Sequence, residues 1–297
     1  MKKTVFLSMM LTIALAMQAQ KIVPQLQKGM EKVYVTTTTT KMAGQPEVTM
    51  TSETKYTVAE ATADGYVIDM VLSAFTTSAA ATDVAGQLLS AAEELTKGVK
   101  VSLVTDKDGQ VKGVKNYAEV KQQTESNCDK VIDKVLSLVP QLSQMMSKDF
   151  LRQQVMGSFT EDMLVKALRD HATVLMLNGK APMTGAQEEY VDSKGIKMKR
   201  LYFVNGSNIV ANATANMTKD ELKAMIISEV EKNMPDQVAM MKQNLDQMIA
   251  SGMLKIDVKE KATYDMQADG WVMSLKVEST LDSMGQSMVS KSETVMK

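Results

Sequence analysis

The sequence predicts an α+β fold, in which a strongly twisted or half-barrel antiparallel sheet of about nine to eleven strands carries helices on its apolar face. Three observations predict this fold. Several segments alternate apolar and polar residues with a period of two, as strands with one buried and one wet face do. Asp-Gly pairs, which supply the positive φ angles of tight hairpin turns, separate such segments. Segments with helical spacing of apolar residues lie between the strand groups and can cover a one-sided sheet.

The chain begins with the features of a secretory leader. Lys2 and Lys3 precede an apolar run from Val5 to Met17, and the small residue Ala19 follows. The run is too short to span a bilayer, and no later stretch approaches about 18 uninterrupted apolar residues. We therefore expect a signal peptide over residues 1–19, cleavage near Ala19, no transmembrane segment and a soluble protein that is periplasmic or secreted. No cysteine stands at the N-terminus that cleavage would create, so we expect no lipid anchor.

The composition argues against partners that bind by charge. The formal net charge of the whole chain is −1, and removal of the leader takes away two lysines and no acidic residue. A slightly acidic protein has no general attraction to nucleic acid or to an anionic membrane. Cys128 is the only cysteine, so no internal disulfide forms and the core must hold the fold together.

Residues 30–115 are the first strand-rich part. The run Thr36–Thr40 lies inside a strand-like stretch from Lys32 to Met42, because β-branched residues favour an extended backbone. A second strand follows the turn at Asp64-Gly65, and residues 82–98 have the spacing and the glycine stop of a helix. One face of the strand after the turn comprises Tyr66, Ile68, Met70, Leu72 and Ala74.

The middle of the chain, residues 117–177, is predicted to be helical. One helical region extends from Tyr117 to Met156 and contains Pro140, which should kink or divide it. A further helix is expected over roughly Glu161–Leu177. Its apolar stripe comprises Leu164, Leu168, His171 and Leu175.

Residues 183–297 are a second strand-rich part with one long helix, which begins with Thr218 and Glu221 in capping-box positions. Asp269-Gly270 repeats the pattern around Asp64-Gly65, and we interpret the echo as one kind of hairpin turn used twice. We expect both strand-rich parts to join one sheet, so that residues 20–297 form a single domain; two domains are the alternative. The apolar faces predicted here are Ile209, Ala211, Ala213, Ala215 and Met217; Leu254, Ile256 and Val258; and Trp271, Met273, Leu275 and Val277.

Methionine is the unusual component, with 27 residues. Met234, Met241 and Met248 recur at seven-residue spacing on one predicted helix face. The simplest interpretation is a packed core, and the alternative is an adaptable surface for apolar ligands, because methionine repacks easily. Copper binding by thioethers is the third reading, although no histidine or cysteine lies near these clusters. The candidate ligand-binding residues are Met70, Leu72, Met234, Met241, Met248 and Met273.

The sequence offers little for catalysis. His171 is the only histidine, so a Cys-His pair could only be Cys128 with His171, and neither neighbourhood supports it. Ser52–Lys55 matches a Ser-x-x-Lys pattern, but it lies in a strand pattern and lacks the companion motifs. We therefore predict no catalytic residues, no metal site, no cofactor and no enzyme activity. A carboxylate-based hydrolase stays an alternative, and it requires a cleft where two carboxylates converge.

The leader, the stretch "LQKGMEKVYV" and the "ADG" hairpins resemble uncharacterised exported proteins of Gram-negative bacteria that are assigned to domains of unknown function. In outline the chain is similar to the periplasmic lipoprotein-carrier superfamily, whose half-barrels shelter lipid chains between a curved antiparallel sheet and inner helices. That resemblance implies shelter for an apolar ligand but transfers no motif residue by residue.

The function expected from the sequence is thus an exported, non-enzymatic binding protein for an apolar ligand such as an acyl chain, a lipid or a lipidated peptide. A pocket of several hundred cubic ångströms lined by Met, Leu and Ala would support it. The runner-up is a structural or interaction module of the cell envelope with a protein partner and no small ligand.

Overall fold

The computed structural model describes residues 21–44, 46–78, 98–138, 140, 147–157, 159–192, 195–233, 242, 245, 247, 256–283 and 286–297. The predicted leader, most of the predicted helix at 82–98, and Met234, Met241 and Met248 lie outside these residues. The limits predicted for the domain, 20–297, stay a prediction.

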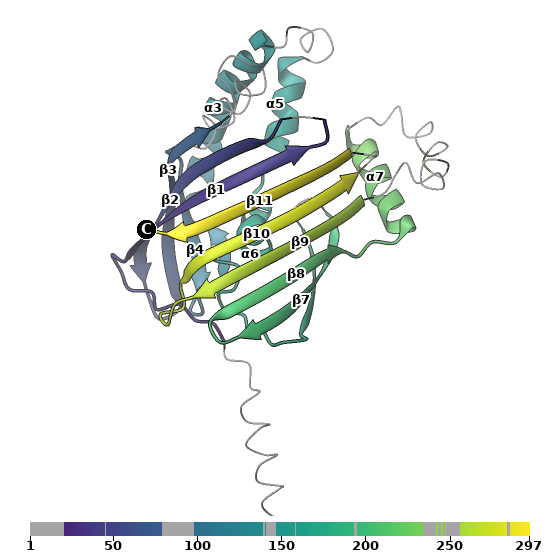
Figure 1. Cartoon of the computed structure of the whole chain (residues 1–297). Coiled ribbons are helices and arrows are strands. Elements are labelled where there is room, and N and C mark those ends of the chain that lie inside the picture. The colour runs from purple at the N-terminus through teal and green to yellow at the C-terminus, as the bar shows by residue number, and fades with distance from the viewer. Residues whose placement is uncertain are drawn as a thin grey trace, which may run out of the picture.

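One antiparallel sheet of eleven strands organises the chain, in the order β5-β4-β3-β2-β1-β11-β10-β9-β8-β7-β6. The first and last strands, β1 and β11, pair in its middle, with Tyr34 opposite Met296 and Met42 opposite Met288. Strands from both strand-rich parts of the sequence therefore lie in one open, curved sheet (Figure 1). The strands are β1 (Glu31–Met42), β2 (Val48–Ala61), β3 (Gly65–Thr77), β4 (Lys100–Asp106), β5 (Val111–Val114), β6 (Gln187–Val191), β7 (Lys197–Asn205), β8 (Asn208–Ala215), β9 (Ile256–Met266), β10 (Val272–Ser283) and β11 (Gln286–Met296).

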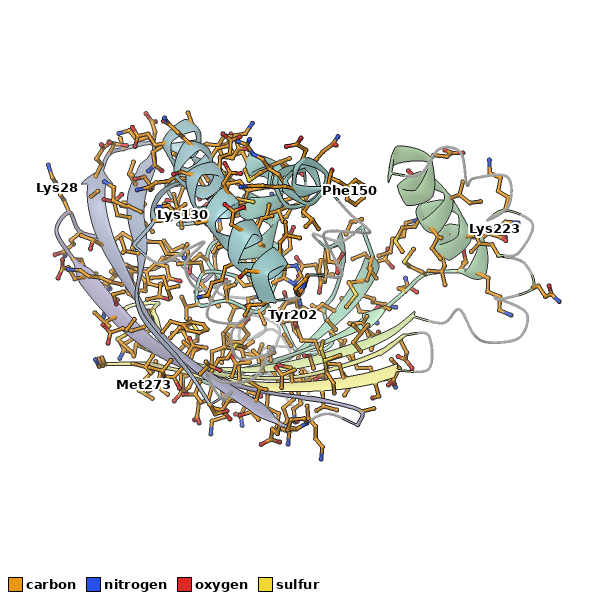
Figure 2. The ribbon with its side chains drawn as sticks, turned by 90° about the horizontal axis from the view of Figure 1, so that it is seen from above. Lys28, Lys130, Phe150, Tyr202, Lys223 and Met273 are labelled. Atoms are coloured by element: carbon orange, nitrogen blue, oxygen red, sulfur yellow. The ribbon has the colours of Figure 1, made fainter. Side chains whose placement is uncertain are left out.

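The described helices are α3 (Tyr117–Leu138), α5 (Lys148–Gly157), α6 (Glu161–Asp170) and α7 (Lys219–Asn233). Seen from above, α3 and α5 lie on the hollow side of the curved sheet, and α7 stands at another part of the same side (Figure 2). Helix α7 begins as predicted: the Thr218 N–H donates to Glu221 Oε2 at 2.9 Å, and the Glu221 N–H donates to Thr218 Oγ1 at 3.2 Å.

Helix α6 is shorter than the sequence predicted, because it ends at Asp170 and not near Leu177. Two side chains donate hydrogen bonds to carbonyl groups at the end of the helix. Thr173 Oγ1 donates to the Leu168 carbonyl at 2.8 Å, and Arg200 donates to the Asp170 carbonyl. The chain then turns, with Leu175 and Leu177 still buried. Capping by side chains therefore replaces the helical hydrogen bonds that the apolar spacing had suggested.

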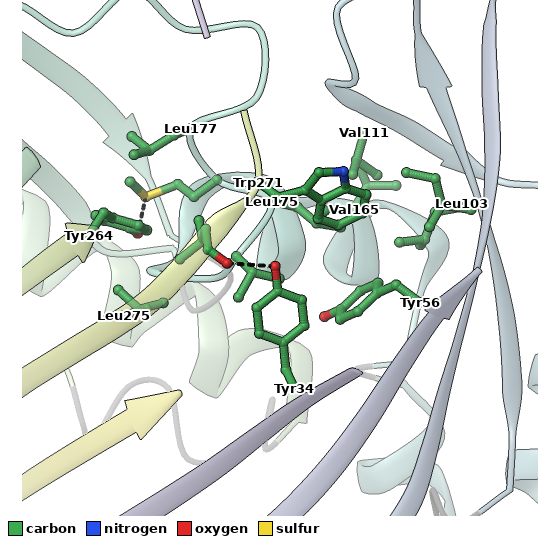
Figure 3. Packing of buried hydrophobic residues seen from close by; sticks show 14 of the residues in the cluster. Tyr34, Tyr56, Leu103, Val111, Val165, Leu175, Leu177, Tyr264, Trp271 and Leu275 are labelled. Atoms are coloured by element: carbon green, nitrogen blue, oxygen red, sulfur yellow. Dashed lines mark hydrogen bonds between the residues drawn. The ribbon is translucent and has the colours of Figure 1, made fainter. Parts of the chain in front are cut away.

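The main core lies where β1 to β4 and β8 to β10 meet the segment after α6, and it includes Val120 of α3 and Val165 of α6. The Tyr34 hydroxyl, fully buried, donates to the Val272 carbonyl at 2.8 Å (Figure 3). The Tyr34 and Tyr56 rings meet edge to face with centroids 5.7 Å apart. The hydrogen bond ties β1 to β10 across the intervening β11, and the ring contact joins β1 to its neighbour β2.

The threonine run is a strand, as predicted, and its hydroxyls form cross-strand pairs on both faces of β1. Thr36 Oγ1 lies 2.9 Å from Thr294 Oγ1 of β11. On the opposite face, Thr37 Oγ1 lies 3.3 Å from Thr51 Oγ1 of β2. The run thus supplies sheet pairing rather than a linker.

Two β-bulges change which side chains face the core, so two of the predicted strand faces are wrong in part. The register of β10 against β9 shifts between Val272 and Ser274, so Trp271 and Val272 are buried while Met273 is 43% exposed. A shift between β2 and β3 beside Ser73 likewise leaves Ala74 exposed. An extra residue in one strand moves later side chains to the other face, which strict alternation cannot anticipate.

The Asp-Gly hairpins are of two kinds, which corrects the interpretation of the echo. Gly109 and Gly270 have φ of 79° and 81°, and both pack on Pro24, whose Cα would lie 2.7 Å from a Cβ at position 270. Gly65 has φ of 155°, and a Cβ there would lie 2.0 Å from the Thr105 carbonyl oxygen. The two "ADG" stretches therefore both connect strands but with different backbones.

Candidate functional site

A cavity of about 390 Å³ lies between the sheet, α7 and the segments that follow α6 and β6. Strands β9, β10 and β11 form its floor, and Met225 of α7 stands on another wall. Its lining comprises His171, Asp192, Ile196, Met225, Val258, Glu260, Ser279, Thr280, Leu281 and Met288.

The apolar floor follows from strand register. Val258 of β9 is paired with Leu281 of β10, and Leu281 is paired with Met288 of β11. Residues paired across neighbouring strands share a face, so these three side chains form a row. Met225 packs with the buried Ile196 near this row, in a small cluster separate from the main core. The apolar side of the cavity is therefore built of flexible aliphatic side chains and methionines.

Glu260 interrupts the apolar face of β9 at the edge of this row. It is paired with Ala213 of β8 and Ser279 of β10. Within the part of the chain that the structure describes, its carboxylate makes no hydrogen bond. Burial raises the pKa of Glu260 above its ordinary value of 4.5, against the opposing attraction of Arg200 and His171. A carboxyl group in this state can interact with a molecule in the cavity.

The second carboxylate of the cavity has a structural role. Asp192 Oδ1 accepts the Ile196 N–H at 2.8 Å, and the Asp192 N–H donates to the Ile196 carbonyl at 2.9 Å. Asp192 thus closes the turn that leads into β7.

A cluster of charged residues lies beside the cavity and surrounds Arg200, whose side chain is 1% exposed. Arg200 Nη1 donates to Glu188 Oε2 at 3.1 Å, and its guanidinium lies 4.1 Å from the centroid of the Tyr190 ring. Lys180 Nζ donates to Glu188 Oε1 at 2.7 Å. Burial is the largest single influence and alone would raise the pKa of Glu188, but the hydrogen bonds from Lys180 and Tyr202 and the charges of Lys180 and Arg200 together hold that pKa below its ordinary value. The positive charge of Arg200 is therefore engaged by groups outside the cavity.

From the edge of the cavity outward, the same face of the central strands carries hydroxyl groups. Starting at Glu260, the paired residues across the sheet are Ser279, Ser290 and Thr40. Thr40 Oγ1 lies 3.4 Å from Ser290 Oγ, and both side chains are half-buried. A row of hydroxyl groups thus adjoins the apolar row of the cavity.

The predicted ligand-binding residues are not brought together by the described structure. Met70 is half-buried against the main core, Leu72 is half-buried on β3, and Met273 is exposed. None of the three lines the cavity. Met234, Met241 and Met248 lie outside the described residues, so their role stays a prediction.

Sequence reasoning missed Glu260, Met225 and the pair Leu281 and Met288. A signal existed for Glu260: it is the acidic residue on a face of β9 that otherwise carries Val258, Ala262 and Tyr264. No comparable signal marked Met288, because Ser290 and Ser292 follow it on the same face and obscure the alternation.

Catalytic and metal chemistry find little support among the described residues. Cys128 is buried in α3, and burial raises the pKa of its thiol, the reverse of what an activated nucleophile needs. No three His, Cys, Asp or Glu side chains of the described ranges are grouped to hold a metal ion. None of the described helices is long and apolar enough to cross a membrane.

Comparison with known proteins gives no family. No family model matches the chain, and no curated protein matches it. The chain is similar to a solved structure described as lipid-protein interactions in lipovitellin, at 8% identity and a TM-score of 0.43, covering 91% of this chain and 25% of that one. It is also similar to a porin-like protein from Bacteroides uniformis, at 10% identity and a TM-score of 0.18, covering 93% of this chain and 99% of that one. The chain spans a quarter of the lipovitellin chain, and neither similarity is close enough to support an argument.

Proposed function

We propose that the protein is an exported, non-enzymatic binding protein whose cavity takes the apolar part of a ligand, such as the acyl chain of a lipid or of a lipidated peptide. The observation that carries the proposal is the cavity of about 390 Å³ with Met225, Leu281 and Met288 in its walls. Ligand pockets of proteins commonly measure about 300–1,000 Å³ and are mainly apolar with few polar groups.

The side chains of the cavity suit a ligand of variable shape. Methionine is unbranched and has three rotatable bonds, so Met225 and Met288 can repack around chains of different length. The adjoining hydroxyl row offers hydrogen bonds to the polar part of such a ligand. The proposal therefore concerns an amphiphile, with its apolar part in the cavity.

The two alternatives fit the cavity less well. An interaction module without a ligand would have a fully packed interior, whereas an apolar cavity is present here. A hydrolase needs two carboxylates free to act, and although Asp192 and Glu260 both line the cavity, Asp192 holds the turn before β7. We therefore favour binding over catalysis.

A pair of tryptophan substitutions on β11 tests the proposal. Met288→Trp places a large ring in the cavity, whereas Val295→Trp on the same strand adds a ring at a side chain that is 42% exposed. Binding is measured by the fluorescence of the neutral apolar probe N-phenylnaphthylamine and its displacement by dodecanol. We expect Met288→Trp to lose binding by about tenfold or more and Val295→Trp to retain it. Equal binding by both variants, or no binding by the unaltered protein, would refute the proposal.

A further inference from the structure

The charged side chains of the cavity restrict which head group a bound ligand can carry. Glu260 and Asp192 are the acidic side chains of its lining, and His171 is its basic side chain. The charged groups that act on Glu260 are Arg200 of β7, His171 after α6 and Asp192 after β6.

Arg200 does not neutralise Glu260 by contact. Its Nη1 donates to Glu188, its Nη2 donates to the Asp170 carbonyl, and its guanidinium stacks on the Tyr190 ring. Ala213 of β8 lies between Arg200 and Glu260 in the pairing across β7, β8 and β9. The Nη1 and Nη2 donors of Arg200 are thus directed to Glu188 and to the Asp170 carbonyl, and neither bonds the Glu260 carboxylate, which lines the cavity.

Two acceptor groups, Glu260 and Ser279, lie side by side in the cavity lining. Glu260 has carboxylate oxygens without a hydrogen-bond donor in the described chain, and its cross-strand neighbour Ser279 lines the cavity with a hydroxyl. An ammonium group has three donors and no acceptor, so it matches a carboxylate beside a hydroxyl oxygen. A fatty-acid carboxylate would instead lie against Glu260 as a like charge.

We propose, on the basis of the binding function proposed above, that the ligand is an amphiphile with a primary ammonium head, which pairs with Glu260 while its alkyl part lies against Met225, Leu281 and Met288. A long-chain amine and the amino group of a lipid both present such a head.

Three ligands of equal chain length test this proposal: dodecylammonium, dodecanol and dodecanoate, each titrated below the concentration at which micelles form. We expect the unaltered protein to bind dodecylammonium about tenfold or more tightly than dodecanol, because a hydrogen bond to a charged group favours the bound state. Dodecanoate should bind most weakly. In Glu260→Gln the preference for dodecylammonium should disappear, while dodecanol binding stays within about twofold.

Glu278→Gln is the matched control, because Glu278 precedes Ser279 on β10 and its side chain is 63% exposed, paired only loosely with Lys291 at 4.0 Å. It should leave all three affinities unchanged. Equal affinity for dodecylammonium and dodecanol, tighter binding of dodecanoate, or a preference that survives in Glu260→Gln would overturn this inference and leave the binding function standing. Failure of all three ligands to bind the unaltered protein would overturn both.

Discussion

Arg200 and Glu188 form an ion pair across neighbouring strands, with Nη1 and Oε2 3.1 Å apart and the Arg200 side chain 1% exposed. Glu188 also accepts from Lys180 at 2.7 Å and from the Tyr202 hydroxyl at 2.5 Å. One carboxylate therefore balances two cations and orients the buried guanidinium beside the cavity. Removal of that carboxylate leaves the buried charge of Arg200 and the half-buried charge of Lys180 without their shared carboxylate.

We predict that Glu188→Gln lowers the free energy of unfolding by about 3 kcal/mol, because breaking one side of a buried ion pair costs far more than the pair itself contributes. Glu278→Gln, which removes an exposed partner of Lys291, should cost less than about 1 kcal/mol. Urea denaturation of both variants at pH 7.5 makes the comparison. Similar small losses in both variants would show that the cluster around Arg200 is not electrostatically buried.

Glu260→Gln should stabilise the protein in a pH-dependent way. Because burial raises the pKa of Glu260 in the folded state, stability from this group is full below about pH 4.5 and decreases as the pH rises through the folded-state pKa. Glutamine carries no charge at any pH, so the variant does not lose this stability, although Arg200, His171 and Asp192 lie nearby. We expect equal Tm values for variant and parent near pH 4 and a Tm higher by on the order of 2 °C in the variant at pH 8. A variant that is less stable at pH 8 would contradict the burial of a charged Glu260.

Gly270→Ala should be much more destabilising than Gly206→Ala. Both glycines have positive φ, 81° and 59°, but a Cβ at Gly270 would approach Pro24 Cα to 2.7 Å, whereas Gly206 has open space. A positive φ alone costs an alanine about 1 kcal/mol, so Gly206→Ala measures that contribution. We expect at least about 1 kcal/mol more for Gly270→Ala by denaturant unfolding. Equal losses would mean that Pro24 does not pack against this turn.

Residues 21–25 are hydrogen-bonded to distant parts of the folded chain. The Ile22 N–H donates to the Lys180 carbonyl at 2.8 Å, and the Gln25 N–H donates to the Asp269 carbonyl at 2.7 Å. Cleavage near Ala19 would leave these contacts intact, so we predict that the protein recovered from an exporting host begins at Gln20. Intact mass measurement checks this. We further expect that deletion through Gln25 lowers the Tm, and a mass that includes residues 1–19 would exclude the predicted leader.

Local pattern predicted those elements whose residues interact within a few positions of one another. Alternation predicted the strand face that begins at Ile209, and Ile209, Ala211 and Ala213 are buried in the structure. Helix-end chemistry predicted the capping box of Thr218 and Glu221, which forms as expected. Met273 and the end of α6 differ because a bulge and two side-chain caps decide them. The Arg200 cap on Asp170 comes from 30 positions away, and the bulge and the Thr173 cap are local irregularities that a periodic pattern does not register.

The cavity depends even more on distant partners. Val258, Leu281 and Met288 become a row only through the pairing of β9, β10 and β11. Met225 joins them from a helix that precedes all three strands in the chain. The methionine content suggested an adaptable apolar site, but its position could not follow from the order of residues alone.

Native mass spectrometry of the protein, purified from an exporting host without detergent, tests the central claim most directly. We predict that the unaltered protein carries an amphiphile at near-stoichiometric level, that extraction identifies an alkyl chain, and that Met288→Trp is recovered without it. A bare mass for the unaltered protein, unchanged after incubation with dodecanol and with dodecylammonium, would contradict the account and favour an envelope protein that binds no small ligand.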